Sequence, residues 1–291
     1  MGVSEEMIVD THVHVWEVDP PRYPVGPTAP NWKGLPDEPG TARELLAEMD
    51  DCGVDWTVIV QTSWSTWDNG YIADSVARFP DRLIGHGLID PQDPANAGQV
   101  TYWMRERGLV GFRFHPLYYP DEKILTNEQN RPMWEELASL DAIVQFHMNA
   151  DYADQVAVIA QRYGSLKLIV DHMGYPDPAK GSAAFQPILD LAQHGSVFLK
   201  LSDVAGRSQQ PFPYEDVHPS IRSLLDAFGA ERMVWGTGYP GHHRQKSNWP
   251  TLADELRLIG EGLPFLSSAQ RERILGGTAK EIWNLRGDNS G

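Results

Sequence analysis

Two histidines near the start of the chain are the residues best suited to chemistry. They belong to the segment from Ile8 to Trp16, an apolar and β-branched run of strand length in which Asp10, His12 and His14 stand two apart. Side chains two apart on a strand point to the same side, so the two imidazoles can share a metal ion without distortion of the backbone. The spacing leaves two interpretations open, a metal or catalytic site and a solvated strand face that carries two histidines.

The elements that must position these histidines alternate between strand-like and helix-like patterns along the whole chain. Strand-like runs begin near Met7, Asp55, Leu83, Val110, Ala142, Leu166, Val197 and Arg232. Helical patterns cover 41–52, 71–79, 97–107, 132–140, 152–163, 185–193, 217–228 and 251–260. This eightfold alternation predicts an α/β fold, the (β/α)8 TIM barrel, and a chain of 291 residues is ordinary for a single domain of that kind over residues 1–291.

Polar side chains end several of the predicted strands. In a TIM barrel the active site lies at the carboxyl ends of the strands, so residues that end different strands meet in one place. In chain order, the strand-end candidates are His12 and His14, then Gln61, Thr62 and Ser63, Asp90, Arg113 and His115, Gln145 and His147, Asp171 and His172, Lys200, Ser202 and Asp203, and Thr237, Gly238 and Tyr239. Five strand-end histidines favour a shared functional site over five separate structural histidines.

Charge and cysteine content limit the partners and the location. With 24 basic and 40 acidic residues the net charge is −16, which argues against binding to nucleic acid or to an anionic membrane surface. The expected partner is a small molecule, and a homo-oligomer is left open. A lone cysteine, Cys52, and an N-terminus without an apolar leader segment favour the cytoplasm. No stretch is long and apolar enough for a membrane helix.

Two segments outside the regular alternation have their own predictions. Residues 17–40, between the first strand and the first helix, carry seven prolines and form a βα loop on the active face, so they are expected to be a rim or lid, with an oligomer contact as the alternative. Trp64, after the second strand, offers an apolar wall to a ring-shaped substrate, although packing explains it nearly as well. Residues 268–285 predict C-terminal helices on the barrel exterior.

Common enzyme signatures are absent or out of context. Residues 235–241 contain the pattern G-x-G-x-x-G, but a dinucleotide site needs a helix that opens at those glycines, and here Pro240 and a polar run over 242–248 follow. The chain has no G-x-S-x-G, H-E-x-x-H or P-loop pattern, which excludes the usual serine-hydrolase, zinc-protease and kinase signatures.

Four single residues each allow a functional and a structural interpretation. His172 follows an apolar strand and suits a general acid or base, with a buried structural histidine as the alternative. His147, at the same depth, suits a third metal ligand beside the first-strand pair. Arg113 offers a planar fork for a carboxylate if it faces the interior, and a salt bridge if it does not. Lys200 lies in an apolar strand, which favours a paired lysine over a free one.

The whole set resembles the amidohydrolase-related family of metal-dependent TIM barrels. The resemblance rests on Asp-Thr-His-Val-His-Val-Trp over 10–16, on His147, on Asp171-His172, and on Trp-Gly-Thr-x-Tyr-Pro over 235–240. The opening segment is most similar to the lactonases of sugar-acid and aromatic breakdown, and another branch contains nonoxidative decarboxylases. The resemblance implies His12, His14 and His147 as ligands of a divalent metal, zinc first, with a metal-free site as the alternative. It also implies His172 as a catalytic histidine. The predicted substrate contacts are Arg113, His115, Trp64, Lys200, Tyr239 and His242.

One position departs from the family pattern. The family usually supplies an aspartate from the eighth strand that binds metal or activates water, and this chain has Gly238 there. Three histidines can still hold zinc and lower the pKa of its water to about 7. A nearby group such as His242, His243 or Asp203 can replace the acid, or Gly238 marks an inactivating substitution or a chain that no longer catalyses.

These observations predict a hydrolase that opens a lactone, or cleaves a related ester, of a small carboxylate-bearing organic acid. Water is activated by metal or by histidine, and His172 moves the proton. The alternative enzyme is a nonoxidative decarboxylase of an aromatic or muconate-type acid. A non-catalytic binder is the third hypothesis, and only Gly238 motivates it.

Overall fold

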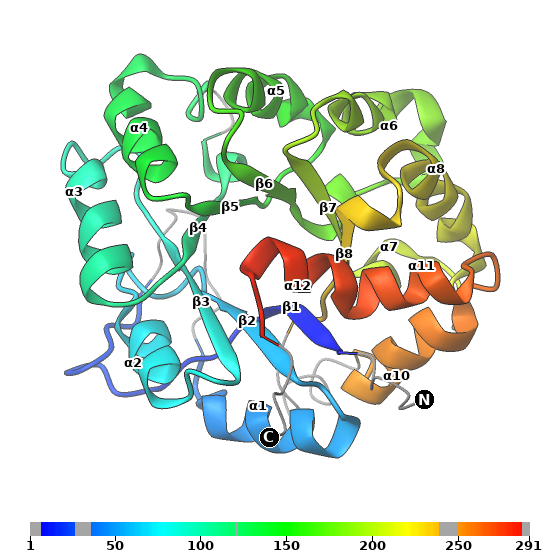
Figure 1. Ribbon diagram of the computed structural model, residues 1–291, viewed down its shortest axis with the longest axis horizontal. Helices are drawn as coiled ribbons and strands as arrows, with labels where there is room; N and C mark the ends of the chain where they lie inside the picture. The colour runs from blue at the N-terminus through cyan, green and yellow to red at the C-terminus, as the bar shows by residue number, and fades with distance from the viewer. Residues whose placement is uncertain (1–6, 27–35, 120–121, 239–248, 287–291) are drawn as a thin grey trace.

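Eight parallel strands form one sheet whose order follows the chain from β1 to β8 (Figure 1). The computed structural model describes residues 7–26, 36–119, 122–238 and 249–286. The strands are β1 (Val9–Val13), β2 (Trp56–Val60), β3 (Leu83–Leu88), β4 (Gly111–Phe114), β5 (Ile143–Phe146), β6 (Lys167–Val170), β7 (Val197–Leu201) and β8 (Met233–Trp235). The α-helices around them are α1 (Ala42–Cys52), α2 (Gly70–Arg78), α3 (Asn96–Thr101), α4 (Arg131–Ser139), α5 (Ala153–Arg162), α6 (Gly181–Asp190), α7 (Val204–Arg207), α8 (His218–Phe228), α10 (Leu252–Arg257), α11 (Ser268–Glu272) and α12 (Thr278–Trp283).

The predicted TIM barrel is confirmed, and each strand begins within two residues of its predicted start. Local sequence explains the sharpest boundaries. Before α1, the Thr41 hydroxyl accepts from the backbone N–H of Glu44, and the Glu44 carboxylate accepts from the backbone N–H of Thr41. Gly53 ends the helix with φ at +72°, a conformation that glycine adopts without steric cost. Patterns of neighbouring residues therefore determine the order of strands and helices.

Side chains help to close the barrel between its last and first strands. The Thr11 hydroxyl donates to the carbonyl of Trp235 at 2.6 Å. Asp10 accepts from Thr237 twice, from the backbone N–H at 3.0 Å and from the hydroxyl at 2.5 Å. Asp10 is 1% exposed. A polar residue of the opening motif therefore joins β1, which carries His12, to the segment after β8 that leads to Gly238.

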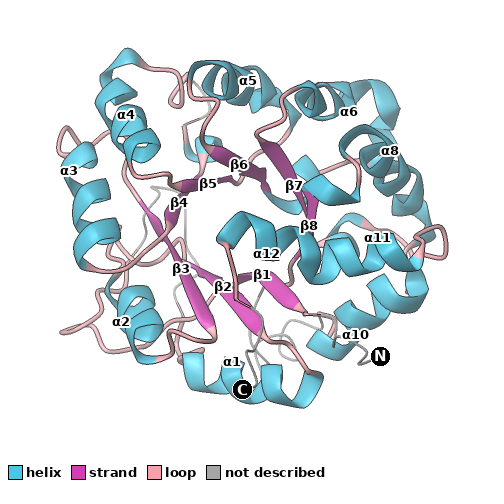
Figure 2. Ribbon diagram, viewed as in Figure 1, coloured by secondary structure: helices cyan, strands magenta, loops and turns pink. Residues whose placement is uncertain are grey.

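The barrel interior changes from apolar to polar along the strands. Apolar side chains that include Val58, Ile84, Ile143 and Ile169 fill the amino-terminal half and pack against α12, which lies across that end of the barrel (Figure 2). Side chains two residues further along the same strands point into the same interior. These positions carry His86 after Ile84, Gln145 after Ile143 and Asp171 after Ile169, as well as Lys200 on β7. The polar layer thus faces the carboxyl ends of the strands, where TIM-barrel chemistry takes place.

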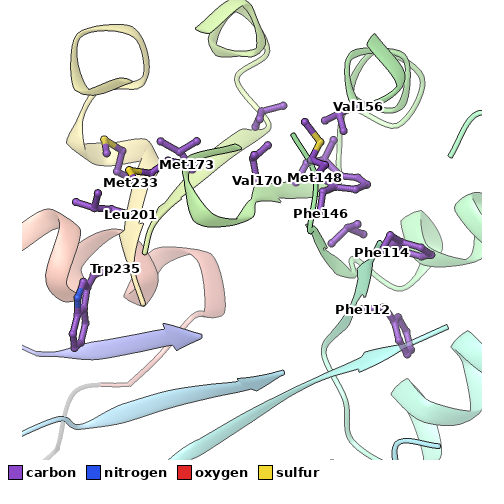
Figure 3. Packing of buried hydrophobic residues seen from close by; sticks show 14 of the residues in the cluster. Phe112, Phe114, Phe146, Met148, Val156, Val170, Met173, Leu201, Met233 and Trp235 are labelled. Atoms are coloured by element: carbon purple, nitrogen blue, oxygen red, sulfur yellow. The ribbon is translucent and has the colours of Figure 1, made fainter. Parts of the chain in front are cut away.

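A second core fills the space between the sheet and the surrounding helices. Phe112, Phe114 and Phe146 belong to this core and are at most 2% exposed (Figure 3). Because side chains alternate along a strand, outward-facing Phe112 and Phe114 require Arg113 to face the interior. The outer packing thereby decides the open question about Arg113 in favour of an interior position.

His86 makes the stability of the barrel depend on pH. It is fully buried on β3 and accepts from the indole N–H of Trp283 at 3.0 Å, and burial lowers the pKa of His86 to about 3. The imidazole of an unfolded chain binds a proton near pH 6.5, whereas the folded chain binds it only near pH 3. Between these values the unfolded state holds one proton more, so the free energy of unfolding decreases as the pH is lowered.

We expect His86 to account for a loss of about 2 kcal/mol between pH 6.5 and pH 4.5, because the slope rises from half to nearly all of about 1.4 kcal/mol per pH unit as the unfolded imidazole becomes protonated. Urea unfolding at both pH values measures it. His86→Gln keeps an acceptor for Trp283 but cannot titrate, so its loss should be smaller by that amount. Equal losses in the wild type and the variant would contradict the assignment.

The long segment after β1 is tied back to the barrel in the parts that the structure describes. Trp16 pairs with Gly40 in an antiparallel bridge, and the Trp16 indole N–H donates to the carbonyl of Glu38 at 2.8 Å. Gly26 pairs with Ser65 after β2. In the described chain, the helices are all too short or too polar to cross a membrane.

Candidate active site

Strand β1 delivers two imidazoles that face one another. The Nε2 atoms of His12 and His14 are 3.3 Å apart, and the rings meet edge to face. Nδ1 of His14 lies 2.7 Å from the carbonyl of Val60, so this nitrogen carries the proton and donates, and Nε2 keeps its lone pair. Burial lowers the pKa of His14 to about 3 and holds the pKa of His12 well below its ordinary value. Both rings are therefore neutral at physiological pH.

A buried carboxylate binds two cations directly beneath these rings. Asp171, after β6, lies 2.7 Å from Nε of Arg113 and 2.8 Å from Nζ of Lys200, and the three side chains are at most 3% exposed. Burial opposes ionisation, but the adjacent Lys200 and Arg113 keep the pKa of Asp171 below its ordinary value. The three residues form a charged triad in the barrel interior.

The amine of Lys200 has three hydrogen-bond partners. Besides Asp171, Nζ lies 2.8 Å from Oε1 of Gln145 and 3.1 Å from Nδ1 of His12. Burial lowers the pKa of Lys200 to about 8, against the effect of Asp171. The charged ammonium donates to all three partners, which places the proton of His12 on Nε2. The neutral amine instead accepts from Nδ1–H of His12, which leaves Nε2 free to bind a cation.

His172 is held as a neutral ring between two partners. Arg113 donates from its terminal nitrogen to Nε2 of His172 at 3.1 Å, because a guanidinium has no acceptor. Nδ1 of His172 therefore carries the proton and donates to Oγ of Ser202 at 2.9 Å. Burial and then Arg113 lower the pKa of His172 well below its ordinary value. Arg113 thus uses two of its nitrogens on Asp171 and His172, and it orients this histidine.

A second group of rings lies on the other side of His172. Nε2 of His147 is 2.5 Å from the Tyr175 hydroxyl, and the two rings are stacked. His115 lies 4.7 Å from His147 between ring centroids and stacks on Tyr118. Among the described residues, no hydrogen-bond partner faces either ring nitrogen of His115, which is 5% exposed. His115 therefore has two nitrogens with which to bind a ligand.

A cavity of about 440 Å³ lies beside the ends of β7 and β8. Its walls include Asp203, Phe212, Tyr214, Thr237, Trp249 and Arg257. Asp203 immediately follows Ser202 and pairs with Arg207 at 3.1 Å. Burial raises the pKa of Asp203 above its ordinary value, and Arg207 acts in the opposite direction. A titratable carboxyl group therefore borders the cavity.

The other predicted contacts are not part of this group or cannot be placed. Trp64 is 8% exposed and packs edge to face on Trp16 at 5.3 Å between ring centroids. Tyr239, His242 and His243 lie outside the described residues.

Three residues that complete the site had no role assigned from the sequence: Gln145 and Ser202, which were recognised only as strand-end residues, and Tyr175, which was not recognised at all. Gln145 and Ser202 end their strands, so their position was a usable signal, but only the folded barrel shows that they bind Lys200 and His172. Tyr175 follows a short turn after β6 in which His172 and Met173 have positive φ. No periodic pattern predicts such a turn, and it alone brings the Tyr175 hydroxyl to His147.

The donor set fits a divalent cation at the end of β1 in the state with a neutral Lys200 amine, which leaves a lone pair on Nε2 of His12. Two zinc ligands at about 2.0–2.1 Å in tetrahedral geometry are roughly 3.3 Å apart, which matches the separation of the His12 and His14 Nε2 atoms. The carbonyl of Val60 orients His14 as a partner of a metal-bound imidazole does. Within the described part of the chain, His12, Asp171 and His172 form the one group of three whose ligand atoms lie within 4.8 Å of one another. Neither His14 nor His147 is in that group.

Several known proteins of similar length resemble this chain in sequence or in fold. L-Fucono-1,5-lactonase of Burkholderia ambifaria is 24% identical over 287 residues, which cover 95% of both chains. A probable 2-pyrone-4,6-dicarboxylic acid hydrolase of Acinetobacter baumannii, with citric acid bound, superposes with a TM-score of 0.79 at 20% identity over 95% of this chain and 99% of that one. An amidohydrolase of Burkholderia multivorans with bound zinc gives a TM-score of 0.75 at 20% identity, over 96% and 100%.

The family model for amidohydrolases matches residues 9–285, from β1 to the residues that follow α12. This match includes every strand and every described residue of the site. The chain belongs to the amidohydrolase family.

Proposed function

We propose that this protein is a hydrolase that opens the ring of a lactone, or cleaves a related ester, of a small organic acid. The observation that carries the proposal is the convergence of neutral, buried imidazoles at the carboxyl end of the barrel. Neutral rings can hold a cation, or accept a hydrogen bond from the substrate, at physiological pH. This chain is similar to L-fucono-1,5-lactonase and to a probable 2-pyrone-4,6-dicarboxylic acid hydrolase, which supports a lactone as the substrate.

The contacts of each site residue suggest a separate role for it in the proposed reaction. His115 has two nitrogens without described partners and is placed to bind a polar group of the substrate. His172 is neutral and fixed by Arg113 and Ser202, so its ring is held in one orientation, and its Nε2 becomes free to hydrogen-bond to the substrate once Arg113 shifts toward developing negative charge. A divalent cation, zinc first, would be held by His12 and His14 and would polarise the substrate carbonyl and acidify bound water.

A lactone panel tests the proposal. Neutral sugar lactones and carboxylate-bearing lactones are incubated with the protein, and acid release is followed by pH-stat with and without a chelator. Ring opening of at least one substrate class is the expected result. Release of carbon dioxide from aromatic acids without lactone opening would replace the proposal with a decarboxylase. Tight binding without turnover of either kind would indicate a non-catalytic binder.

His115→Gln is expected to lower kcat/KM by about 10- to 100-fold, since one or two hydrogen bonds to substrate are each worth about 1–1.5 kcal/mol. His194→Gln is the matched control, because His194 precedes β7 at the opposite end of the barrel. Steady-state kinetics on the best lactone measures both. Equal effects of the two substitutions would remove His115 from the substrate site.

A further inference from the structure

The space into which a side chain at position 238 would project is already bordered by another carboxyl group. A Cβ added to Gly238 would meet nothing nearer than Cζ3 of Trp249, at 3.9 Å. Trp249 and the preceding Thr237 line the 440 Å³ cavity, and Asp203 lines the same cavity. The space beside Gly238 therefore adjoins, through Trp249 and Thr237, a cavity whose wall carries the carboxyl groups of Asp203, Asp254 and Glu255.

The backbone conformation at Gly238 is unfavourable for an aspartate. Its φ is +156°, a conformation that L side chains rarely adopt. Its carbonyl accepts from the backbone N–H of His14 at 2.7 Å, which fixes this conformation beside β1. An aspartate at 238 would have to change the backbone that supports His14, so the acid is more readily supplied from a neighbouring strand.

Asp203 follows the neighbouring strand, and continuing the register in which Leu201 pairs with Trp235 places it level with Thr237, which precedes Gly238 and lines the same cavity. It comes two residues after the end of β7, directly after Ser202, whose hydroxyl accepts from His172. Its partner Arg207 lies 4.8 Å from the ring centroid of Tyr175, and the Tyr175 hydroxyl lies 2.5 Å from His147. Asp203 is therefore adjacent in the chain to Ser202, the partner of His172. Contacts through Arg207 and Tyr175 also connect it to His147.

We propose that Asp203 is the catalytic general base that replaces the aspartate absent at position 238. The proposal rests on lactone hydrolysis as the function. Asp203 removes a proton from water as the water oxygen bonds to the lactone carbonyl carbon. The tetrahedral intermediate then breaks the bond between that carbon and the ring oxygen, and the protonated Asp203 returns the proton to the departing alkoxide. The products are one hydroxy acid and unchanged Asp203, and lactone plus water accounts for every atom.

The surroundings of Asp203 define the pH dependence. The charged and titratable groups that face it are Arg207 on α7 and Tyr175, with Asp254, Glu255 and Arg257 of α10 around the same cavity. The base works only when ionised, so the rate falls as the pH falls through the pKa of Asp203. Loss of the Arg207 cation raises that pKa, so the acid limb of the profile moves to higher pH.

If the ion pair between Asp203 and Arg207 were only structural, its two substitutions would change the kinetics differently from those of a general base. If Asp203 only held Arg207, then removal of either partner would have the same modest effect. A general base instead makes the two substitutions unequal. Asp203→Asn is expected to lower kcat by about 100- to 10,000-fold and to abolish the acid limb. Arg207→Gln should retain most of kcat and shift the limb upward.

A second variant leaves both charges in place. A Cβ at position 206 would lie 2.1 Å from Oδ1 of Asp203 and must displace the carboxylate. Gly206→Ala is therefore expected to lower kcat at least tenfold even though Asp203 and Arg207 both remain. It keeps the proposal testable if Asp203→Asn fails to fold.

The experiment is a set of kcat and kcat/KM profiles from pH 4 to 9 for wild type, Asp203→Asn, Arg207→Gln and Gly206→Ala, with thermal unfolding of each. Unequal losses and the upward shift in Arg207→Gln support Asp203 as the base. Equal small losses in Asp203→Asn and Arg207→Gln, with an active wild type, overturn the role of Asp203 and leave lactone hydrolysis standing. A wild type without activity on any lactone overturns both.

Discussion

Replacement of Asp171 with asparagine is expected to lower the free energy of unfolding by about 3–5 kcal/mol, the largest stability change among the predictions. Asp171 is fully buried and binds Arg113 and Lys200 within 2.8 Å. The amide that replaces it has no charge, so two cations stay buried without compensation. The cost is dominated by this loss of compensation and not by the weak net value of an ion pair.

Guanidinium unfolding followed by fluorescence measures the change, and Asp74→Asn is the matched control. Asp74 also binds two arginines, Arg22 and Arg107, each at 2.8 Å, but its side chain is 35% exposed. Surface pairs of this kind contribute about 0–1 kcal/mol. A loss in Asp171→Asn as small as that of Asp74→Asn would show that water reaches the triad.

A double variant separates charge from shape. Asp171→Asn with Lys200→Met removes one of the two uncompensated cations, so the double variant should be more stable than the sum of the single losses predicts. Additive losses would mean that Lys200 and Asp171 do not interact in solution.

The barrel follows from the sequence because its signals are local. Apolar runs predict strands, a capping box before α1 predicts a helix start, and each depends only on neighbouring residues. The inward position of Arg113 is also local information, since Phe112 and Phe114 on either side are large and apolar. Sequence alone left that position open because it does not say which face meets the helices.

The pairings inside the site are not local, and this is why they could not be predicted. Lys200 binds groups from three other strands, and only the curvature of the barrel brings them within reach of one amine. Nε2 of His147 faces Tyr175 because the turn after β6 has positive φ at His172 and Met173. The identity of a strand-end residue was predictable, but the atom toward which it points was not.

This difference bears directly on which histidines hold a metal. The family resemblance implies His12, His14 and His147, whereas the folded chain brings together the Nε2 atoms of His12 and His14 and places His147 against Tyr175. The hydrogen bond with the tyrosine must break before Nε2 of His147 can bind a cation, and Nδ1 has no hydrogen-bond partner among the described residues.

We therefore expect His14→Gln to weaken zinc binding by at least about 100-fold, more than loss of an outer-shell partner, and to abolish any chelator-sensitive hydrolysis. His147→Gln should change zinc affinity by no more than about threefold, since its Nε2 is already bound by a neutral hydroxyl donor. Competition against a zinc-chelating dye, with metal content per chain measured for both variants, separates the two sets. Equal losses would show that Tyr175 releases His147 when metal binds, and zinc binding unchanged in both would move the cation away from β1 altogether. The larger loss of zinc affinity expected for His14→Gln follows from the 3.3 Å between the Nε2 atoms of His12 and His14. At this distance the two nitrogens can share a cation only when neither of them carries a proton.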